Sequence, residues 1–132
     1  MANEKLTDHI IARLLNQAGI DFTPNESSIV EINNALKTSS KRGTGNKGFP
    51  EFVAQVGEFI LVIEDKADPE KQGKYINDKK DTLLMDNDGI VNYAENGALH
   101  YALHIIQNTS FKKIIAFGCS GTEQERIRIR PI

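Results

Sequence analysis

Hydrophobic residues recur at intervals of three and four positions near the start of the chain. The positions that follow this spacing are Leu6, Ile10, Ile11, Leu14 and Leu15. Such a stripe is typical of an amphipathic helix, because it places the apolar side chains on one side of the helix axis. We therefore expect a first helix over roughly residues 3–17, ending before Gly19.

A second helix is indicated by signals of helix initiation. In the segment Thr23-Pro24-Asn25-Glu26 the threonine can cap a helix, the proline suits the first helical position, and the glutamate lies three residues after the cap. The sequence thus predicts a helix that opens here and runs to about Thr38. Its buried stripe would consist of Ile29, Ile32 and Leu36.

The segment FPEFVAQVGEFILVIEDKAD, residues 49–68, contains two apolar runs and predicts a β-hairpin. Gly57-Glu58 separates the runs and suits a two-residue turn of type II′, in which glycine takes the first central position. Such a turn pairs Val56 with Phe59. Every further pair in the hairpin then follows by counting outward from these two residues.

Two acidic residues are expected to meet across this hairpin. The register puts Glu51 opposite Glu64, while the alternation of side chains puts Lys66 on the face of Glu64 and Asp65 on the other face. Like charges in this position cost roughly 0.2–1 kcal/mol at a surface. A hard divalent cation such as Mg²⁺, which takes oxygen ligands, would turn the repulsion into chelation. The alternative is an ordinary surface salt bridge with Lys66.

The segment after the hairpin is polar and aperiodic. Over residues 67–91, Asp88-Gly89 predicts a turn between two short strand-like pieces, LLM and IVNY. A calcium-binding loop is the weaker interpretation of the same acidic residues, because Leu84 would occupy its first ligand position.

The last part of the chain predicts a helix followed by two strands. A broad apolar face extends over about residues 92–107, and FKKIIAFGCSG is typical of a buried strand closed by a glycine turn. Beyond it, alternating arginine and apolar residues predict an edge strand. The arginines are Arg126, Arg128 and Arg130. The order of helices and strands predicts an α/β domain.

Length, composition and charge limit the organisation of the protein. The chain has 132 residues, of which 39% are hydrophobic and 26% charged, so we expect one domain, residues 1–132, with one core. The formal net charge of −2 provides no overall cationic field, so binding of nucleic acid would need a local basic patch. The final RIRIRPI has no polar tail, which predicts a domain cut from a longer chain; the family resemblance given below implies that it is the amino-terminal part.

Cysteine content and hydropathy indicate the compartment. Cys119 is the single cysteine, so no disulfide can form within the chain, and we interpret it as a small residue at a strand end. The sequence has no evident signal peptide and no apolar span of about 18 residues. These features predict a soluble cytoplasmic protein with no membrane partner.

The acidic hairpin resembles a known enzyme superfamily. Pro50-Glu51, the turn, and Glu64-Asp65-Lys66 resemble the motif of PD-(D/E)XK nucleases. More extensively, KTSSKRGTGNKGFPEF, VIEDKAD and NGALHYALHI are similar to the amino-terminal nuclease region of restriction-modification enzymes, either type I R subunits or fusions in which the nuclease precedes an adenine methyltransferase. The resemblance covers residues 26–120 and implies a restriction-endonuclease-like central mixed sheet flanked by helices.

The resemblance implies roles for individual residues. Glu51 and Glu64 would bind Mg²⁺, and Lys66 would position or activate the attacking water during hydrolysis of a DNA phosphodiester. Glu51 stands where the family usually has the shorter aspartate. Some members also use a glutamate from the preceding helix, and Glu31 is the candidate here. A capping or solvated helix residue is the alternative for Glu31.

The resemblance also implies partners. The basic loop 37–48 would contact DNA phosphates through Lys37, Lys41, Arg42 and Lys47, although an ordinary solvated loop has the same composition. Other expected partners are methyltransferase and specificity domains or subunits. Two other functions remain open: a non-catalytic nuclease-like domain that binds DNA or scaffolds subunits, and a junction-resolvase-like nuclease.

One further pair of residues has the spacing of a metal site. His100 and His104 lie four positions apart on the predicted last helix, a spacing that can chelate zinc. Because no H-E-x-x-H pattern accompanies them, we interpret them as solvated or partly packed histidines.

Overall fold

The computed structural model describes residues 4–24, 27, 29–40, 48–77, 79, 82–123 and 127–131. Its helices are α1 (Glu4–Gln17), α2 (Val30–Ala35), α3 (Asn87–Asn92) and α4 (Ala94–Asn108), with 3₁₀ turns η1 (Leu36–Thr38) and η2 (Pro69–Lys71). Its strands are β1 (Thr23–Pro24), β2 (Phe52–Val56), β3 (Phe59–Lys66), β4 (Ile114–Ser120) and β5 (Arg128–Pro131). The first helix, the last long helix and the last two strands confirm the predicted elements to within a few residues.

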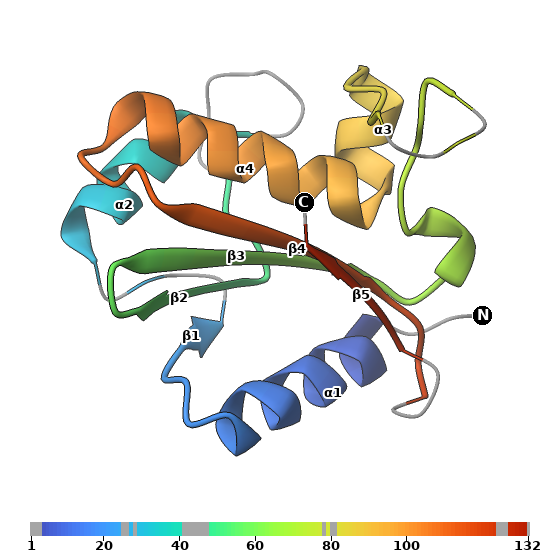
Figure 1. Ribbon diagram of the computed structural model, residues 1–132, viewed down its shortest axis with the longest axis horizontal. Helices are drawn as coiled ribbons and strands as arrows, with labels where there is room; N and C mark the ends of the chain where they lie inside the picture. Colours follow the sequence, from blue (N-terminus) through green and yellow to red (C-terminus); the bar gives the residue numbers. More distant parts are fainter. Residues whose placement is uncertain are drawn as a thin grey trace.

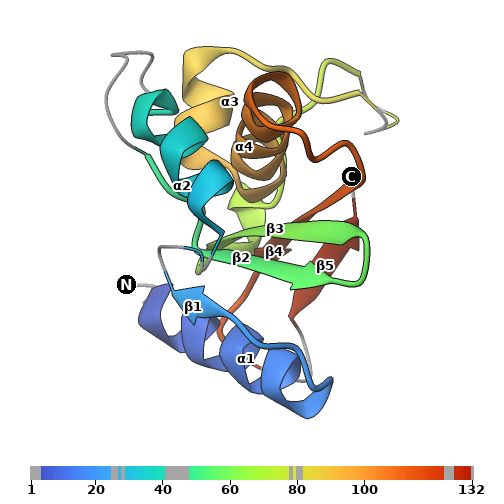
Figure 2. The ribbon, with the colours of Figure 1, turned by 90° about the vertical axis from the view of Figure 1, so that its left-hand side faces the viewer.

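The strands form one five-stranded sheet in the order β1-β2-β3-β4-β5. Only β3 and β4 run parallel, and the other neighbouring pairs are antiparallel. Helix α1 covers one face of the sheet, while α2 and α4 cover the other (Figures 1 and 2). This arrangement confirms the predicted class, an α/β domain with a central mixed sheet flanked by helices.

The hairpin of β2 and β3 has the predicted register. Val56 pairs with Phe59, and Phe52 pairs with Ile63 at the other end of the ladder. Gly57 in the turn has a φ of 59°, a conformation that glycine adopts without steric cost. The count outward from the turn therefore holds along the whole of β2, and Glu51 lies one position before its first residue.

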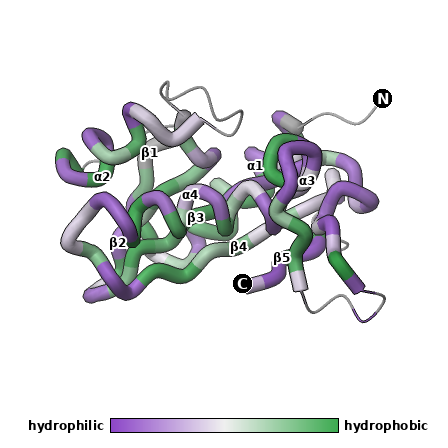
Figure 3. The backbone as a smooth tube through the Cα atoms, turned by 90° about the horizontal axis from the view of Figure 1, so that it is seen from above, coloured by the Kyte–Doolittle hydropathy of each residue, from purple (hydrophilic) through white to green (hydrophobic). Residues whose placement is uncertain are grey.

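Each face of the sheet has its own hydrophobic core. Ile60 and Val62 of β3 pack with Tyr101 and Ile105 of α4. On the other face, Ile63 packs in a cluster with hydrophobic residues of α1. Hydrophobic residues concentrate along the strands, whereas the segment around α3 is mostly hydrophilic (Figure 3). The alternation along β3 thus decides whether a side chain faces α1 or α4.

The start of α4 approaches the sheet closely. An added Cβ at Gly118 of β4 would lie 2.6 Å from the backbone nitrogen of Glu95 and 2.5 Å from its Cγ. A side chain at this position would collide with the first turn of the helix. Gly118 therefore lets α4 lie against the sheet where the parallel strands end.

The predicted start of the second helix was wrong. Thr23 and Pro24 form the short edge strand β1, which pairs with Val53 and Phe52 of β2, and α2 begins only at Val30. Pairing with the sheet outweighs the local capping signal, since proline is tolerated at a sheet edge, where no ladder hydrogen bond is required of it. The ring of Phe22 packs edge-on against Phe52, with centroids 5.2 Å apart.

The predicted turn at Asp88-Gly89 and the strand after it were also wrong, because these residues belong to α3. The Oδ1 of Asp86 accepts a hydrogen bond from the backbone N–H of Gly89 at 2.7 Å and caps this helix. Lys74 forms ion pairs with Asp86 and Asp88 at 2.8 and 2.9 Å. The cap at Asp86 and the ion pairs with the distant Lys74 together stabilise the start of α3. The Asp-Gly dipeptide alone suggested a turn.

Candidate metal centre

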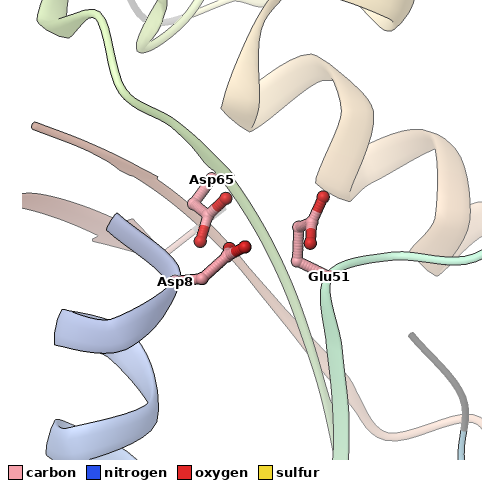
Figure 4. Close-up of side chains that lie close together, drawn as sticks. All are labelled: Asp8, Glu51 and Asp65. Atoms are coloured by element: carbon pink, nitrogen blue, oxygen red, sulfur yellow. The ribbon is translucent and has the colours of Figure 1, made fainter. Parts of the chain in front are cut away.

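Three carboxylate side chains converge at one end of the sheet. Asp8 comes from α1, Glu51 from the segment before β2, and Asp65 from β3. One oxygen of each lies within 4.8 Å of one oxygen of each of the others, as Figure 4 shows. Three residues far apart in the sequence thus form a group of oxygen donors.

Asp65 is the most deeply buried of the three. Its residue is only 1% exposed, and neither carboxylate oxygen accepts a hydrogen bond from any residue that the structure describes. Burial raises the pKa of Asp65 to about 10, assisted by the hydrogen bond that its protonated form can make with the Asp8 carboxylate and by the charges of Asp8, Glu51 and Glu64. A charged Asp65 is therefore costly in the protein alone, and a cation would remove the cost.

A cysteine beside Asp65 experiences the same surroundings. Cys119 pairs with Asp65 in the parallel ladder of β3 and β4 and is 2% exposed. Burial, together with the charge of Asp65, raises the pKa of the Cys119 thiol to about 12. The thiol therefore stays protonated near neutral pH, and Cys119 is a buried strand residue, as predicted.

Asp8 is positioned by the way α1 packs on the sheet. It precedes Ile11 and Leu15 by three and seven positions, which places it on the side of the helix that faces the sheet. Next to it, Thr7 is fully buried, and its hydroxyl donates a 2.6 Å hydrogen bond to the backbone carbonyl of Gly121. This bond fixes the start of α1 beside the end of β4, which is why Asp8 reaches the group.

Glu51 connects the group to the other face of the sheet. Its backbone N–H donates a 2.9 Å hydrogen bond to Oε1 of Glu64, which is 2% exposed and lies under Gly97 of α4. Burial, followed by the charges of Glu64 and Glu51, raises the pKa of Tyr101 on the same helix. Glu51 adjoins Glu64, as the register predicted, but its carboxylate groups with Asp8 and Asp65.

This orientation follows from where the regular strand begins. The ladder of β2 starts at Phe52, so the alternation of side chains does not constrain Glu51, which follows Pro50. Within the described part of the chain, Glu64 is not a member of a three-carboxylate group. The predicted register places Glu51 next to Glu64, as the hydrogen bond from the Glu51 N–H shows. The carboxylate of Glu51, however, lies with Asp8 and Asp65.

The two other predicted catalytic residues lie far from each other, Lys66 at the end of β3 and Glu31 in α2 near the chain that enters β4. Lys66 is half-buried at the end of β3, where it pairs with Ser120 of β4. In contrast, the carboxylate of Glu31 accepts hydrogen bonds from the hydroxyl and the backbone N–H of Ser110, at 2.6 and 2.7 Å. These bonds lower the pKa of Glu31. Ser110 lies before the first residue of β4, so the structure does not bring Glu31 to the three acids.

The remaining predicted contacts are divided between described and undescribed residues. Lys37 is exposed in η1, whereas Lys41, Arg42 and Lys47 lie outside the described residues. His100 and His104 place Nε2 at 2.8 and 3.0 Å from the backbone carbonyl oxygens of Ser39 and Ala35. The two histidines are thus partly packed and tie α4 to the end of α2 and to η1.

Asp8 and Asp65 were missed as candidate ligands, although the sequence contains a signal for both. Asp8 continues the apolar stripe of α1, and Asp65 continues the alternation of Leu61 and Ile63 along β3. Each is an acid at a position where the pattern expects a core residue. Two such acids on elements that face each other are a stronger indication of a site than either one alone.

The donor set fits a hard divalent cation. Mg²⁺ takes oxygen ligands and is usually bound by one or two carboxylates together with water and substrate phosphates. Buried carboxylate oxygens without partners, such as those of Asp65, are costly unless an ion or a proton satisfies them. The fold and the site together define a mixed α/β domain with a candidate metal centre at the end of its parallel strands.

A comparison with known proteins gives one informative similarity. The chain is 36% identical to the Type II restriction enzyme and methyltransferase RM.BcgI of Heyndrickxia coagulans, over an alignment that covers 92% of this chain and 19% of that protein. This chain thus spans about a fifth of the length of its relative. No protein-family model matches the sequence, and no solved structure matches it.

Among the described residues, no helix is both long and apolar enough to cross a bilayer.

Proposed function

We propose that this domain is the Mg²⁺-dependent DNA endonuclease part of a restriction-modification protein. The observation that carries the proposal is the convergence of Asp8, Glu51 and Asp65, in which a buried carboxylate has no partner. The similarity to a restriction enzyme and methyltransferase supports the same function. The proposed substrate is the DNA phosphodiester, and the proposed partners are methyltransferase and specificity domains or subunits.

Glu51 is central to the proposed site, since it adjoins acids on both faces of the sheet. Asp8 and Asp65 approach it from the side of α1, and Glu64 binds its backbone N–H from the side of α4. We propose that Asp8, Glu51 and Asp65 hold the ion and that Glu64 both contributes a charge to it and orients Glu51. A bound Mg²⁺ would supply Lewis-acid polarisation of the phosphate and a lower pKa for bound water.

Lys66 is proposed to act on the substrate. It follows Asp65 directly, and alternation places its side chain on the face of Glu64. An ammonium group in this position would stabilise the negative charge that develops on the phosphate during hydrolysis. The basic residues of loop 37–48 are proposed to contact phosphates without regard to base sequence.

Plasmid cleavage by the natural protein in Mg²⁺ tests the proposal. We expect Glu51→Ala, Asp65→Asn, Glu64→Ala and Lys66→Ala each to lower the rate strongly. Glu58→Ala is the matched control, because Glu58 is an exposed acid of the same hairpin that pairs with Lys113 at the opposite end of β3. Cleavage by the Glu58 variant should equal that of the wild type.

Each result has a defined consequence. Normal cleavage by both the Glu64 and Lys66 variants would reject the roles carried over from the sequence resemblance. Normal cleavage by the Asp65 variant would reject the ligand group seen in the structure. Cleavage by the wild type in excess EDTA would exclude a metal-dependent mechanism altogether.

A further inference from the structure

A second polar site lies on the α4 side of the sheet, opposite the face on which Asp8 and Asp65 meet. It is a cavity of about 680 Å³ between β5 and the segment that follows β3, and its volume falls within the range of about 300–1,000 Å³ typical of ligand sites. Its polar lining includes Gln72, Tyr75, Glu95, Arg128 and Arg130. None of these residues has a role in the site described above.

A buried glutamate organises the wall of this cavity. Glu95 is 1% exposed, and its carboxylate accepts hydrogen bonds from Nε2 of Gln72 and from the hydroxyl of Tyr75, both at 2.8 Å. Burial and the Glu95 carboxylate raise the pKa of Tyr75 to about 12. The tyrosine therefore remains a hydrogen-bond donor, and the buried carboxylate is held by groups that suit its charge.

Arg130 contacts Glu95 and Tyr75 of this wall, although its side chain is partly exposed to solvent. Its Nη1 lies 3.5 Å from Oε1 of Glu95 and donates a 3.0 Å hydrogen bond to the hydroxyl of Tyr75. The guanidinium carbon lies 5.5 Å from the centroid of the Tyr75 ring, and 46% of the side chain is exposed. A guanidinium that is already oriented loses less conformational entropy when it binds a ligand.

Arg128 adds a positive charge that no acid among the described residues balances. It lies two positions before Arg130 on β5, so both side chains project from the same face of the strand. Arg128 is exposed and forms no ion pair with the residues that the structure describes. Since the carboxylate of Glu95 balances Arg130, Arg128 supplies the charge available for an anion.

The cavity is connected to Lys66 through the sheet. Lys66 of β3 pairs with Ser120 of β4, and Ser120 pairs with Arg128 of β5. Ser120 also donates a 2.6 Å hydrogen bond to Oε1 of Gln72 in the cavity wall. Because neighbouring strands lie about 4.8 Å apart, this row of three residues spans roughly 10 Å.

We propose that Arg128 and Arg130 bind a phosphodiester of the DNA strand near the one that is cleaved. The ligand identity rests on the proposed nuclease function. A DNA strand carries one phosphate per about 3.4 Å of helix axis, so a strand with a phosphate at Lys66 presents further phosphates along the row to Arg128. Guanidinium groups bind phosphate oxygens through two parallel N–H donors, which suits this contact.

Salt-dependent binding of DNA tests the proposal independently of cleavage. The 132-residue chain is titrated with a labelled 30-base-pair duplex at several salt concentrations. Ca²⁺ replaces Mg²⁺, because it takes the same oxygen ligands with less demanding geometry. Loss of one phosphate contact reduces the slope of log K against log salt by about 0.9. We expect this reduction, with severalfold weaker binding, for Arg128→Ala, and a slope close to the wild-type value for Arg128→Lys.

Lys113→Ala is the matched control. Lys113 precedes β4 at the opposite end of the sheet, where it pairs with Glu58, and its removal changes the net charge equally. An unchanged slope for this variant supports the proposal. Failure of the wild type to bind DNA, an Arg128→Ala slope equal to that of the wild type, or the same reduction for Lys113→Ala would overturn it.

Competition distinguishes a DNA phosphate from a free one. Adenosine monophosphate and inorganic phosphate are added to the wild-type complex, and neither should displace the duplex at concentrations far below those of the salt. Displacement at low concentration that depends on Arg128 would identify a free phosphate ligand instead. A chain that binds DNA through Arg128 but never cleaves it would remove the proposed nuclease function and leave the contact between Arg128 and a DNA phosphate standing.

Discussion

Asp65 and Glu95 are equally buried carboxylates with opposite surroundings. Each residue is 1% exposed, and both lie near the same end of the parallel strands β3 and β4. Glu95 accepts hydrogen bonds from Gln72 and Tyr75 and lies beside Arg130. Asp65 instead receives no hydrogen bond from the described residues and faces two other acids. The fold can therefore supply hydrogen-bond donors to a buried carboxylate at this end of the sheet. That Asp65 lacks them suggests that something outside the chain binds it.

The difference separates a structural carboxylate from a candidate ligand. A buried group whose partners are all supplied by the protein stabilises one arrangement of the chain. A buried group without partners costs free energy until something outside the chain binds it. A carboxylate thus stabilises the fold at position 95 and, in our proposal, binds the catalytic metal ion at position 65.

The largest expected effect is the loss of cleavage on substitution of Asp65. Asp65→Asn keeps the size of the side chain and removes the charge that holds the ion, so cleavage in Mg²⁺ should fall by roughly 10²–10³-fold or more. Initial rates of plasmid cleavage measure the effect. An Asp65→Asn rate close to that of the wild type would make the two buried carboxylates equivalent and would end the comparison.

Substitution of Glu95 should affect stability. Glu95→Ala leaves the buried amide of Gln72 without one acceptor and the half-exposed Arg130 without its counter-charge. The buried polar group that loses a partner makes the expected cost about 1–3 kcal/mol. Urea unfolding measures the change in the free energy of unfolding. A change near zero would show that the Glu95 contacts do not support the fold.

Asp65→Asn should stabilise the domain when metal is absent. At pH 8 the folded domain must keep a proton on Asp65 that the unfolded chain has lost. Asparagine removes this cost, so the free energy of unfolding is expected to rise by about 1–3 kcal/mol. Thermal unfolding in EDTA at pH 8 tests this expectation. Added Mg²⁺ should stabilise the wild type by mass action and leave the variant almost unchanged. A variant less stable than the wild type in EDTA would contradict the claim that Asp65 destabilises the metal-free domain.

The pH dependence of this gain has a definite sign. The pKa of Asp65 rises from 3.8 to about 10 on folding, so between these values the folded domain retains a proton that the unfolded chain has lost. Asp65 therefore makes the metal-free wild type lose stability as the pH rises through this window. The stability difference between Asp65→Asn and the wild type should grow from pH 4 upward, and a constant difference would contradict this reasoning.

The smallest effect should distinguish two substitutions of Glu64. Glutamine retains a carbonyl oxygen that can accept the N–H of Glu51 but lacks the charge proposed to assist the ion. We expect Glu64→Gln to lower cleavage by roughly 10–100-fold and Glu64→Ala to lower it further. A glutamine variant as active as the wild type would restrict Glu64 to orienting Glu51.

The hairpin could be predicted from the sequence because its determinants are local. The position of Gly57 between two apolar runs fixed the turn, and the register up to Glu51 followed by counting. The edge strand β1 and helix α3 were missed because distant contacts decide them. Pro24 pairs with β2, and Lys74 supports the start of α3.

The candidate site was only partly predictable for the same reason. Alternation correctly put Asp65 on the opposite face from Glu64, but which carboxylates meet depends on how α1 lies on the sheet. The hydrogen bond from Thr7 to Gly121 joins residues 114 positions apart, and no local pattern reports such a contact. Asp8 was therefore found only once the helix had been placed.

The absence of a side chain at Gly118 limits how this domain can diverge. The first turn of α4 passes so close to β4 that its backbone, and not only the Glu95 side chain, occupies the space that a Cβ would need. Among descendants that retain this packing, replacement of the acid at position 95 would not release position 118 from glycine. The glutamate at position 95 can therefore be replaced while position 118 stays glycine. A larger residue at position 118, in contrast, would require the helix to move away from the sheet.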